Sequence, residues 1–269
     1  MSVPLFHVDA FTERPFGGNP AAVCVLPDER PDAWMQSVAG EMNLSETAFL
    51  RRTGDVWPLR WFTPALEVDL CGHATLASAH VLWQAGYEKP DAPIVFETKS
   101  GRLTARRRDA AAAHEIQLDF PAEPASPCEP PDGLLEALGI ASPRFAGRNR
   151  FDFFFELPSE SDVRALTPDF RRIVETAGPA RGVIVTAPAS GRGYDFVSRY
   201  FAPAYGIDED PVTGSAHCCL GPHWAGRLGR TELTGYQASR RGGTVFVRVG
   251  GDRVSLGGQA VTIARGELL

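Results

Sequence analysis

Along most of this chain, large apolar residues alternate with small or polar ones at the two-residue period of β-strands. The pattern predicts strands at 6–11, 21–26, 59–62, 94–98, 103–106, 151–157, 182–186 and 197–201, and Gly-punctuated strands at 244–249, 253–256 and 260–264. Helical spacing is found at 31–42, 74–86, 134–138 and 169–176. A further short apolar strand follows a turn at 43–45 and carries one acid, Glu46, at its start.

A proline-rich segment divides the chain. Residues 121–131 contain five prolines and few apolar side chains, which is typical of a linker between domains. We therefore expect a first domain over residues 1–120 and a second domain that begins at residue 132.

The two parts contain similar sequences in the same order. The run RWFTPA at 60–65 returns as RYFAPA at 199–204, a shift of 139 positions, and GHA at 72–74 returns as GSA at 214–216, a shift of 142 positions. Gly101 and Arg106 match Gly243 and Arg248 at the same shift of 142. Such internal similarity predicts two similar domains with a binding site at their interface.

Each part contains a glycine turn that opens a helix, at Gly72 and at Gly214. Glycine and small residues at a helix N-terminus leave backbone N–H groups open to an anion. Asp210 lies shortly before the second turn, and a carboxylate in that place favours proton chemistry on a negatively charged substrate. The alternative is an ordinary N-capped helix that follows an acidic loop.

The polar residues differ between the two parts. The strand at 182–186, which corresponds to the strand that begins at Glu46, has no acid. Asp210 aligns with Val68, His73 with Ser215, and Cys71 with Thr213. If the two turns face each other, one substrate meets Glu46 on one side and Asp210 on the other, with His73 near both. Proton transfer needs a base within reach of a carbon-bound proton and donors for the resulting enolate charge.

Each candidate also has an ordinary structural interpretation. A lone glutamate at a strand start is usually a surface residue, a histidine at a helix start is as often a capping or packing residue, and Cys71 has the character of a small buried hydrophobe. A metal site is a further possibility, because four residues with metal-binding side chains lie close together in the sequence: His217, Cys218, Cys219 and His223. Adjacent cysteines on a helix diverge by about 100°, so they cannot both face one ion, and we predict no metal.

Composition narrows the function classes. For 269 residues the net charge is −6 and the isoelectric point about 5.6, which argues against a nucleic-acid-binding surface. No segment has the continuous apolar length of a membrane-spanning helix, and the first residues lack the pattern of a secretory signal. The five cysteines are odd in number and scattered, which favours reduced thiols and a cytoplasmic location.

Four motifs taken together resemble one known family. They are VDAFTxxPFxGNPAAV at 8–23, NLSETAF at 43–49, FTPxxEVDLCGHATLA at 62–77 and EDPVTGSAH at 209–217. In order and over nearly the whole chain, they resemble the PhzF-like family, named for an isomerase of phenazine biosynthesis. The resemblance implies the α+β diaminopimelate-epimerase fold, with two similar domains that each wrap a curved, mostly antiparallel sheet round a central helix.

The resemblance also implies domain limits, partners and cofactors. The last strand of this fold usually returns to the first domain, so we expect residues 260–269 there and a second domain of 132–259. No cofactor is expected, and a homodimer is common in the family. The implied reaction is the isomerisation of a small carboxylate-bearing compound, in the named enzyme a dihydro-hydroxyanthranilate.

Individual site residues follow from the family motifs. The glutamate of the SET motif, here Glu46, transfers the proton, while His73 and Asp210 assist and position the substrate. The backbones of Gly72-His73 and Gly214-Ser215 resemble the carboxylate-binding nest. Asn19 in the GNP motif is similar to a substrate-side asparagine of the family.

Two other functions compete with this one. Thiol-based amino-acid racemases, epimerases and hydroxyproline dehydratases of the same fold place a cysteine, or a cysteine and a threonine, in the two glycine turns. Cys71 and Thr213 occupy those positions here. The second alternative is a non-catalytic protein that binds a ligand or a partner, and the intact set of Glu46, His73 and Asp210 argues against it.

Overall fold

The computed structural model describes residues 2–110, 113–191 and 193–269. The chain divides into two compact units, of which unit 1 comprises Met1–Phe120 and Ser255–Leu269 and unit 2 comprises Pro121–Val254. The proline-rich segment therefore lies in unit 2, where its short strand β9 (Ser126–Pro127) pairs with β10 (Phe145–Arg148). Within the described residues, no helix combines the length and apolarity needed to cross a bilayer.

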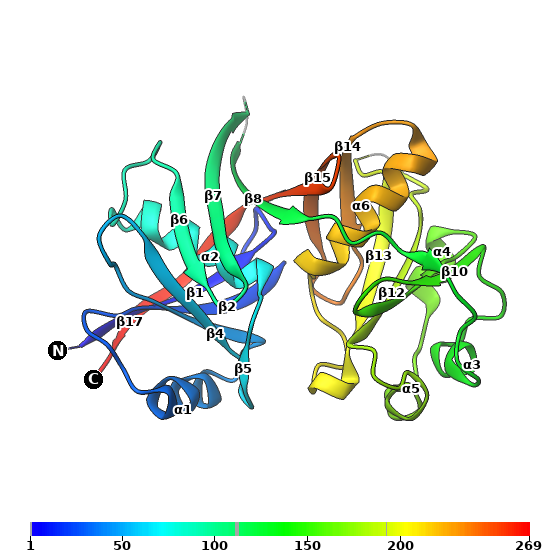
Figure 1. The fold of residues 1–269 in the computed structure, drawn as a ribbon, viewed down its shortest axis with the longest axis horizontal. Helices are drawn as coiled ribbons and strands as arrows, with labels where there is room; N and C mark the ends of the chain where they lie inside the picture. Colours follow the sequence, from blue (N-terminus) through cyan, green and yellow to red (C-terminus); the bar gives the residue numbers. More distant parts are fainter. Residues whose placement is uncertain (1, 111–112, 192) are drawn as a thin grey trace. The chain divides into compact units, whose positions relative to one another are not determined.

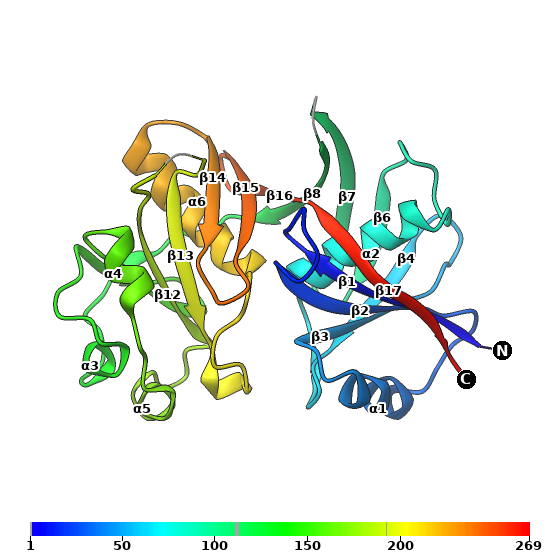
Figure 2. The same ribbon diagram turned by 180° about the vertical axis from the view of Figure 1, so that it is seen from behind.

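Unit 1 is a strongly curved sheet with two helices (Figure 1). Its elements are β1 (Val3–Ala10), β2 (Asn19–Val25), α1 (Asp32–Met42), β3 (Glu46–Leu50), β4 (Trp57–Phe62), β5 (Glu67–Val68), α2 (Gly72–Gln84), β6 (Ile94–Thr98), β7 (Gly101–Ala110), β8 (Ala113–Pro121) and β17 (Ala260–Leu268). The strands pair in the order β17, β1, β2, β3, β4, β6, β7, β8. The last strand of the chain thus lies beside the first, as the view from behind shows (Figure 2).

Helix α2 is the centre of unit 1. Every residue from His73 to Trp83 except His80 is buried, because the sequence of this helix is apolar or small on all sides. The helix packs against β1, β2, β3 and β17. Its N-terminal turn is therefore held by the surrounding strands, and that turn carries the predicted residues Gly72 and His73.

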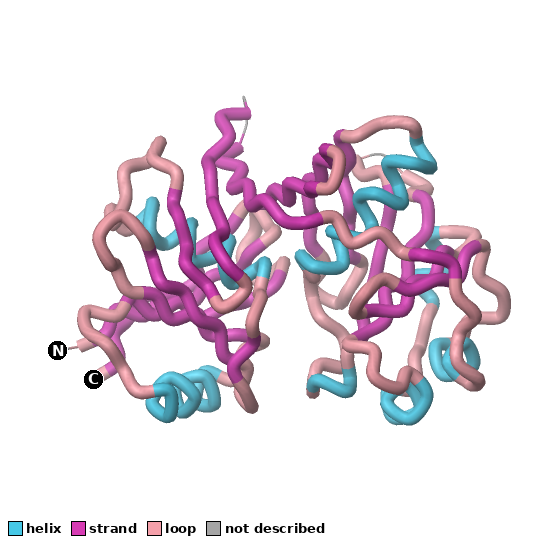
Figure 3. The backbone as a smooth tube through the Cα atoms, viewed as in Figure 1, coloured by secondary structure: helices cyan, strands magenta, loops and turns pink. Residues whose placement is uncertain are grey.

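Unit 2 repeats this plan with more helices at its periphery (Figure 3). In addition to β9 and β10 it contains α3 (Leu134–Leu138), β11 (Asp152–Glu156), α4 (Glu160–Ala165), α5 (Phe170–Thr176), β12 (Gly182–Pro188), β13 (Phe196–Phe201), the 3₁₀ turn Pro203–Tyr205, α6 (Gly214–Leu228), β14 (Glu232–Gln237), β15 (Gly243–Gly250) and the start of β16 (Arg253–Gly258). The strand β16 continues into unit 1 and pairs with β8. Helix α6 packs against β14 and β15 and buries most of its first half.

The strand pairings of the two units follow the same pattern. In unit 1, β2 and β3 are parallel, β3 and β4 antiparallel, β4 and β6 parallel, and β6 and β7 antiparallel. In unit 2, the same sequence of directions joins β11, β12, β13, β14 and β15. Each unit thus builds its central sheet from the same pairings, which places the N-terminus of α2 and that of α6 in corresponding positions of their own units.

The register identifies corresponding residues without the use of sequence similarity. Thr47 pairs with Phe62, and Val183 pairs with Phe201, so Glu46 in unit 1 corresponds to Gly182 in unit 2. Ala21 pairs with Glu46, just as Asp152 pairs with Gly182. The next step along the antiparallel pair makes Trp61 the counterpart of Tyr200.

Several elements of the structure were not predicted from the sequence pattern: β5, β8, β9, β10, β14, α4 and the 3₁₀ turn Pro203–Tyr205. Two of the strands contain an internal glycine, Gly147 in β10 and Gly235 in β14, which interrupts the apolar alternation. Gly235 lies against a neighbouring strand, since a Cβ atom there would approach the ring of Phe196 to 2.5 Å. Tertiary packing, and not local preference, explains a glycine inside this strand.

Candidate active site

The centre of the candidate site is the contact between Glu46 and His73. Glu46 is the first residue of β3, and His73 lies in the first turn of α2. Glu46 Oε2 is 3.1 Å from His73 Nε2, and the two side chains are 12% and 5% exposed. The two atoms are close enough for an ion pair, but their geometry is not that of a hydrogen bond. Within the described residues, neither atom has any other hydrogen-bond partner. A buried carboxylate and a buried imidazole with hydrogen-bonding capacity to spare are suited to receive a ligand.

Two further side chains approach the other nitrogen of the His73 ring. Asn19 Nδ2 is 3.1 Å from His73 Nδ1, and Cys71 Sγ is 3.5 Å from the same atom. With the amide as the donor, Nδ1 accepts and Nε2 carries the ring proton toward Glu46. If the side-chain amide of Asn19 is rotated by 180°, its oxygen accepts a hydrogen bond from a protonated Nδ1. Asn19 can therefore hydrogen-bond to both the neutral and the charged imidazole.

Burial and neighbouring groups act in opposite directions on His73. Burial lowers the pKa of the imidazole, but Cys71 and Glu46 raise it more, and the net pKa lies well above its usual value. Burial, followed by the charge of Glu46, raises the pKa of Cys71 to about 11. At neutral pH the thiol is therefore protonated, so the partner that favours a charged imidazole is the carboxylate of Glu46.

The N-terminus of α2 has open backbone donors. Cys71 is the N-cap residue and has an extended conformation, with φ −146° and ψ 110°, but its side chain accepts no hydrogen bond from the first turn. Orphan N–H groups at a helix start otherwise need a side chain, water or a ligand. The turn Gly72-His73 thus combines these donors with the Glu46–His73 pair.

In unit 2, Asp210 lies in the loop before α6. The residue is 8% exposed, and Thr213 Oγ1 donates to Asp210 Oδ2 over 2.5 Å. The backbone N–H of Asp210 donates to Tyr200 O, a contact that corresponds to the pairing of Val68 with Trp61 in unit 1. The structural alignment therefore agrees with the sequence alignment of Asp210 with Val68.

A glutamine that the sequence did not suggest holds this loop. Gln237 is fully buried at the end of β14, donates through Nε2 to Asp210 O over 2.7 Å, and accepts at Oε1 from the N–H of Thr213 over 2.9 Å. The side chain of Thr213 is engaged with Asp210 and does not cap α6. As in α2, the first-turn donors of α6, at Gly214 and Ser215, have no side-chain cap.

Ser215 is itself part of a polar cluster in unit 2. Arg181 Nη2 lies 3.3 Å from Ser215 Oγ and 3.3 Å from Asp152 Oδ2. Tyr200 donates its hydroxyl to Asp152 Oδ1 over 2.9 Å, and Asp152 is completely buried. Arg181, Asp152 and Tyr200 were not singled out in the sequence, because they come from three different strands or strand ends and no local motif joins them.

One set of side chains has the donor types of a metal site. The ligand atoms of Glu46, Cys71 and His73 lie within 4.8 Å of one another. The sulfur of Cys71 contacts Nδ1 while the carboxylate of Glu46 contacts Nε2, so the two flank opposite nitrogens of one ring. This geometry suits hydrogen bonding along the ring better than three ligands on one ion.

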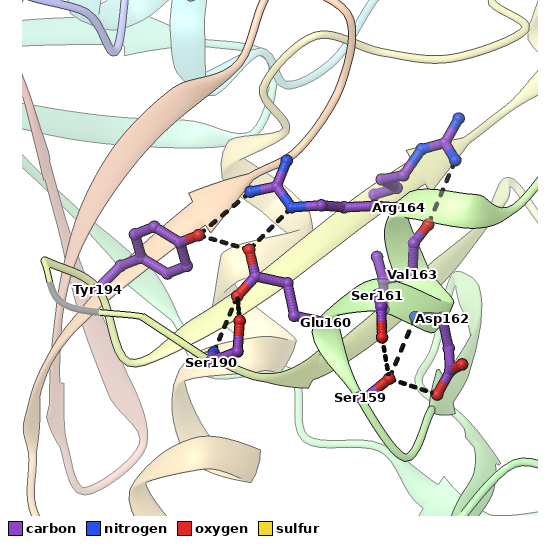
Figure 4. Close-up of polar contacts among 9 residues, drawn as sticks. Ser159, Glu160, Ser161, Asp162, Val163, Arg164, Ser190 and Tyr194 are labelled. Atoms are coloured by element: carbon purple, nitrogen blue, oxygen red, sulfur yellow. Dashed lines mark hydrogen bonds and ion pairs between the residues drawn. The ribbon is translucent and has the colours of Figure 1, made fainter.

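Another buried carboxylate, Glu160, has a structural role (Figure 4). It accepts hydrogen bonds from Tyr194, from both the backbone and the hydroxyl of Ser190, and from Arg164. Burial raises the pKa of Glu160, but these hydrogen bonds outweigh it and lower the pKa to about 2. Its acceptor oxygens are engaged by the protein, so the carboxylate anchors the segments at Ser190 and Tyr194 to α4 and offers little to a ligand.

The predicted residues thus fall into one group in each unit. The structure places Glu46 and Asn19 at opposite nitrogens of the His73 ring, beside Gly72 in unit 1. In unit 2, Asp210 contacts Thr213, and Gly214 and Ser215 form the next turn of the chain.

The buried histidine His217 plays a structural part: its Nδ1 lies 2.8 Å from Thr213 O, and burial lowers its pKa to about 4.

Comparison with known proteins assigns this arrangement to a family. The family model described as phenazine biosynthesis-like protein, PhzC-PhzF, matches residues 8–266. The chain belongs to the PhzF family. An uncharacterised isomerase of Halalkalibacterium halodurans is 54% identical over 270 residues, with 100% of this chain and 99% of that protein covered. An uncharacterised isomerase of Pseudomonas aeruginosa is 48% identical over 268 residues, with 100% and 99% covered.

A solved structure extends the likeness to the whole fold. The PhzF-family protein of Enterococcus faecalis superposes with a TM-score of 0.91 at 44% identity, and the match covers 100% of both chains. The predicted α+β fold of the diaminopimelate-epimerase type is thereby confirmed, and so is the family resemblance. Since its curated PhzF relatives are named isomerases, this PhzF-family protein is an isomerase.

Proposed function

We propose that this PhzF-family isomerase moves a proton between two carbons of a small carboxylate-bearing substrate, with Glu46 as the proton carrier. The observation that supports this best is the buried Glu46–His73 contact of 3.1 Å beside the uncapped start of α2. A general base must lie within hydrogen-bond reach of the proton it takes, and its partner must support both of its protonation states.

The proposed reaction conserves electrons and atoms. The carboxylate of Glu46 takes a proton from one carbon, and the C–H electron pair becomes an enolate-type π system conjugated with the double bond of the substrate. The resulting carboxylic acid exchanges its proton with solvent water and returns a proton to a different carbon, which moves the double bond. The N–H groups of Gly72 and His73 at the start of α2, and those of Gly214 and Ser215 at the start of α6, are proposed substrate-binding donors for anionic groups.

His73 and Asp210 have supporting roles in this proposal. His73 faces Glu46 through Nε2 and is held from the other side by Asn19, so it orients the carboxylate and balances its charge. Asp210, held by Thr213 and Gln237, is proposed to orient a polar group of the substrate. Asn19 is proposed to contribute through His73 and on the substrate side. No cofactor takes part in the proposed steps.

A thiol mechanism is the second candidate, since Cys71 and Thr213 are the N-cap residues of α2 and α6. Such a mechanism requires a thiolate, whereas the pKa of about 11 keeps Cys71 protonated at neutral pH. A two-thiol mechanism places one thiol on each face of the reacting carbon. Here Thr213 stands at the position that matches Cys71, so only one thiol is present. These observations favour Glu46 over Cys71 as the base.

The two mechanisms are distinguished by hydrogen exchange. The protein is incubated in heavy water with a panel of small carboxylates, including dihydro-hydroxyanthranilate, and carbon-bound deuterium is detected by mass spectrometry and NMR. We expect exchange with wild type and Cys71→Ala, and none above background with Glu46→Gln. An active Glu46→Gln variant with an inactive Cys71→Ala variant would favour the thiol mechanism.

We also propose that the enzyme acts as a homodimer in the cytoplasm of its host. The homodimer follows from the family resemblance, and the location follows from the scattered cysteines of the sequence. Light scattering coupled to size exclusion should give twice the chain mass of 29.1 kDa. Cell fractionation should recover the protein with cytoplasmic markers.

A further inference from the structure

Unit 2 has a polar cluster at the place where unit 1 has its candidate base. By strand register, Gly182 occupies the position of Glu46, and Ser215, like His73, is the second residue of its helix. Asp152, which pairs with Gly182, replaces Ala21. In unit 2 the carboxylate is therefore on the neighbouring strand, where it lies buried.

Arg181 connects this buried carboxylate to the start of α6. Its Nη2 bridges Asp152 Oδ2 and Ser215 Oγ at 3.3 Å each, and its guanidinium lies over the ring of Phe151 at 4.5 Å from the centroid. Asp152 is further fixed by the hydroxyl of Tyr200. The guanidinium is thus held in one place on two sides, by a fully buried anion and by an aromatic face.

The guanidinium retains hydrogen-bonding capacity on its open side. The Arg181 side chain is 27% exposed, and its hydrogen bonds to Asp152 and Ser215 both leave from Nη2. Tyr200 also interacts with the guanidinium, and the donors that Asp152, Ser215 and Tyr200 do not engage remain for a ligand. Ser215 Oγ accepts from Arg181, which leaves its own hydrogen to donate. A fork of guanidinium donors beside a free hydroxyl donor matches the oxygens of a carboxylate.

We propose that Arg181 is a substrate-binding residue that recognises the anionic group of the substrate together with Ser215, and that Asp152 and Tyr200 are its positioning residues. The inference rests on the proposed function, because it concerns the carboxylate of the same substrate. It assigns the proton chemistry to the Glu46 group and recognition of the anion to the Arg181 group, two arrangements built on corresponding positions of a repeated scaffold.

The test measures binding of a simple anion and needs no knowledge of the natural substrate. Benzoate is titrated into the whole protein by calorimetry at millimolar concentrations, with benzamide as an uncharged molecule of the same shape. Wild type should bind benzoate in preference to benzamide. Arg181→Gln should weaken benzoate binding at least about tenfold and remove the preference, since hydrogen bonds to a charged group contribute on that order. Arg181→Lys should show an intermediate loss, because it retains the charge without the fork.

A paired variant separates binding from folding. Arg181→Gln leaves Asp152 buried without its cation, so Asp152→Asn combined with Arg181→Gln provides an uncharged cluster that retains hydrogen-bonding groups. This double variant should keep the thermal midpoint of wild type and show the same loss of benzoate binding. Benzoate affinity equal to that of wild type in either folded variant would overturn the proposal. So would the failure of wild type to bind benzoate.

A variant in the other unit separates this inference from the proposed reaction. Glu46→Gln should bind benzoate as wild type does, while its deuterium exchange is lost. If Glu46→Gln retains exchange and Arg181→Gln still loses benzoate binding, the proposed reaction is wrong and the role of Arg181 stands. If exchange is lost in Glu46→Gln and benzoate binding is unaffected in Arg181→Gln, the reaction stands and the role of Arg181 is wrong.

Discussion

The N-terminal turns of α2 and α6 share a backbone arrangement and differ in the chemistry around them. At the start of α2, an imidazole lies between the carboxylate of Glu46 and the amide of Asn19. At the start of α6, a serine hydroxyl lies beside the guanidinium of Arg181. In both helices the N-cap side chain leaves the first-turn donors open. The repeated backbone thus provides the same anion-binding donors twice, and the side chains give each copy a different additional capability.

Two linked positions explain how the copies diverged. Tyr200 replaces Trp61, and its hydroxyl reaches Asp152, whereas the indole nitrogen of Trp61 has no hydrogen-bond partner within the described residues. Gly182 replaces Glu46, and a Cβ atom at Gly182 would approach the ring and hydroxyl of Tyr200 to 2.5 Å. The tyrosine and the glycine therefore depend on each other, so unit 2 has no room for an acid in the place where unit 1 has Glu46.

The strongest test of this difference is the removal of the proton carrier from unit 1. Glu46→Gln keeps the shape of the side chain and removes the base, so turnover or deuterium exchange should fall by about 10²–10⁴-fold. The thermal midpoint should change little, because the site is at the edge of the core. Cys71→Ala is the matched control at the same helix start and should keep most of the activity.

A smaller effect is expected from Asp210 in unit 2. Asp210→Ala should weaken both substrate binding and turnover by about tenfold to a hundredfold, the size of a lost hydrogen bond to a charged group. Asp208→Ala changes an exposed acid of the same loop and should leave steady-state constants unchanged. Constants for Asp210→Ala that match those of wild type would remove Asp210 from the proposed mechanism.

The dependence of Tyr200 on Gly182 can be tested through stability. Gly182→Ala should destabilise the protein by about 1–3 kcal/mol, the usual cost of an overpacked core, as measured by urea unfolding. Gly226→Ala is the matched control, since Gly226 is an exposed residue of α6 with no atom within 4 Å of the added Cβ. There the same change should stabilise the helix by up to about 1 kcal/mol. Equal effects at the two positions would contradict the packing argument.

The smallest effect concerns the charge on His73. The pKa of His73 in the folded protein is well above the usual 6.5, so its protonated form stabilises the fold at pH values below about 6.5. This contribution should diminish as pH rises through the folded pKa. The stability difference between wild type and His73→Gln should therefore shrink from pH 6 toward higher pH.

His217 provides the opposite case in unit 2. Its folded pKa is about 4, below the unfolded value of 6.5, so it costs stability only as pH falls through that window. Above pH 6.5 the difference between wild type and His217→Gln should stay constant. A constant difference for His73→Gln over the same range would mean that Glu46 does not hold a proton on His73.

The amino-acid sequence by itself determined the family, the repeat and the identity of the open helix starts. Strand periodicity and glycine placement are local properties, so the local pattern alone identifies 72–74 and 214–216 as turns into helices. The local pattern also identifies Glu46 as the acid at the start of the strand 46–50. The strands β10 and β14 escaped prediction because each contains a glycine, Gly147 or Gly235, that packs against residues distant in the sequence.

Only the tertiary structure decided which side chains surround each helix start. Asn19 and His73 are 54 positions apart, and Arg181 and Ser215 are 34 apart, so no local pattern joins them. The tertiary fold brings each residue of a helix start against a residue at the start of a distant strand, Asn19 at the start of β2 and Arg181 just before β12. Burial then sets their protonation, because the cost of a charge depends on the neighbours that fold around it. Motifs can name Glu46 and His73, but the partner that holds a charge in place is a property of the fold.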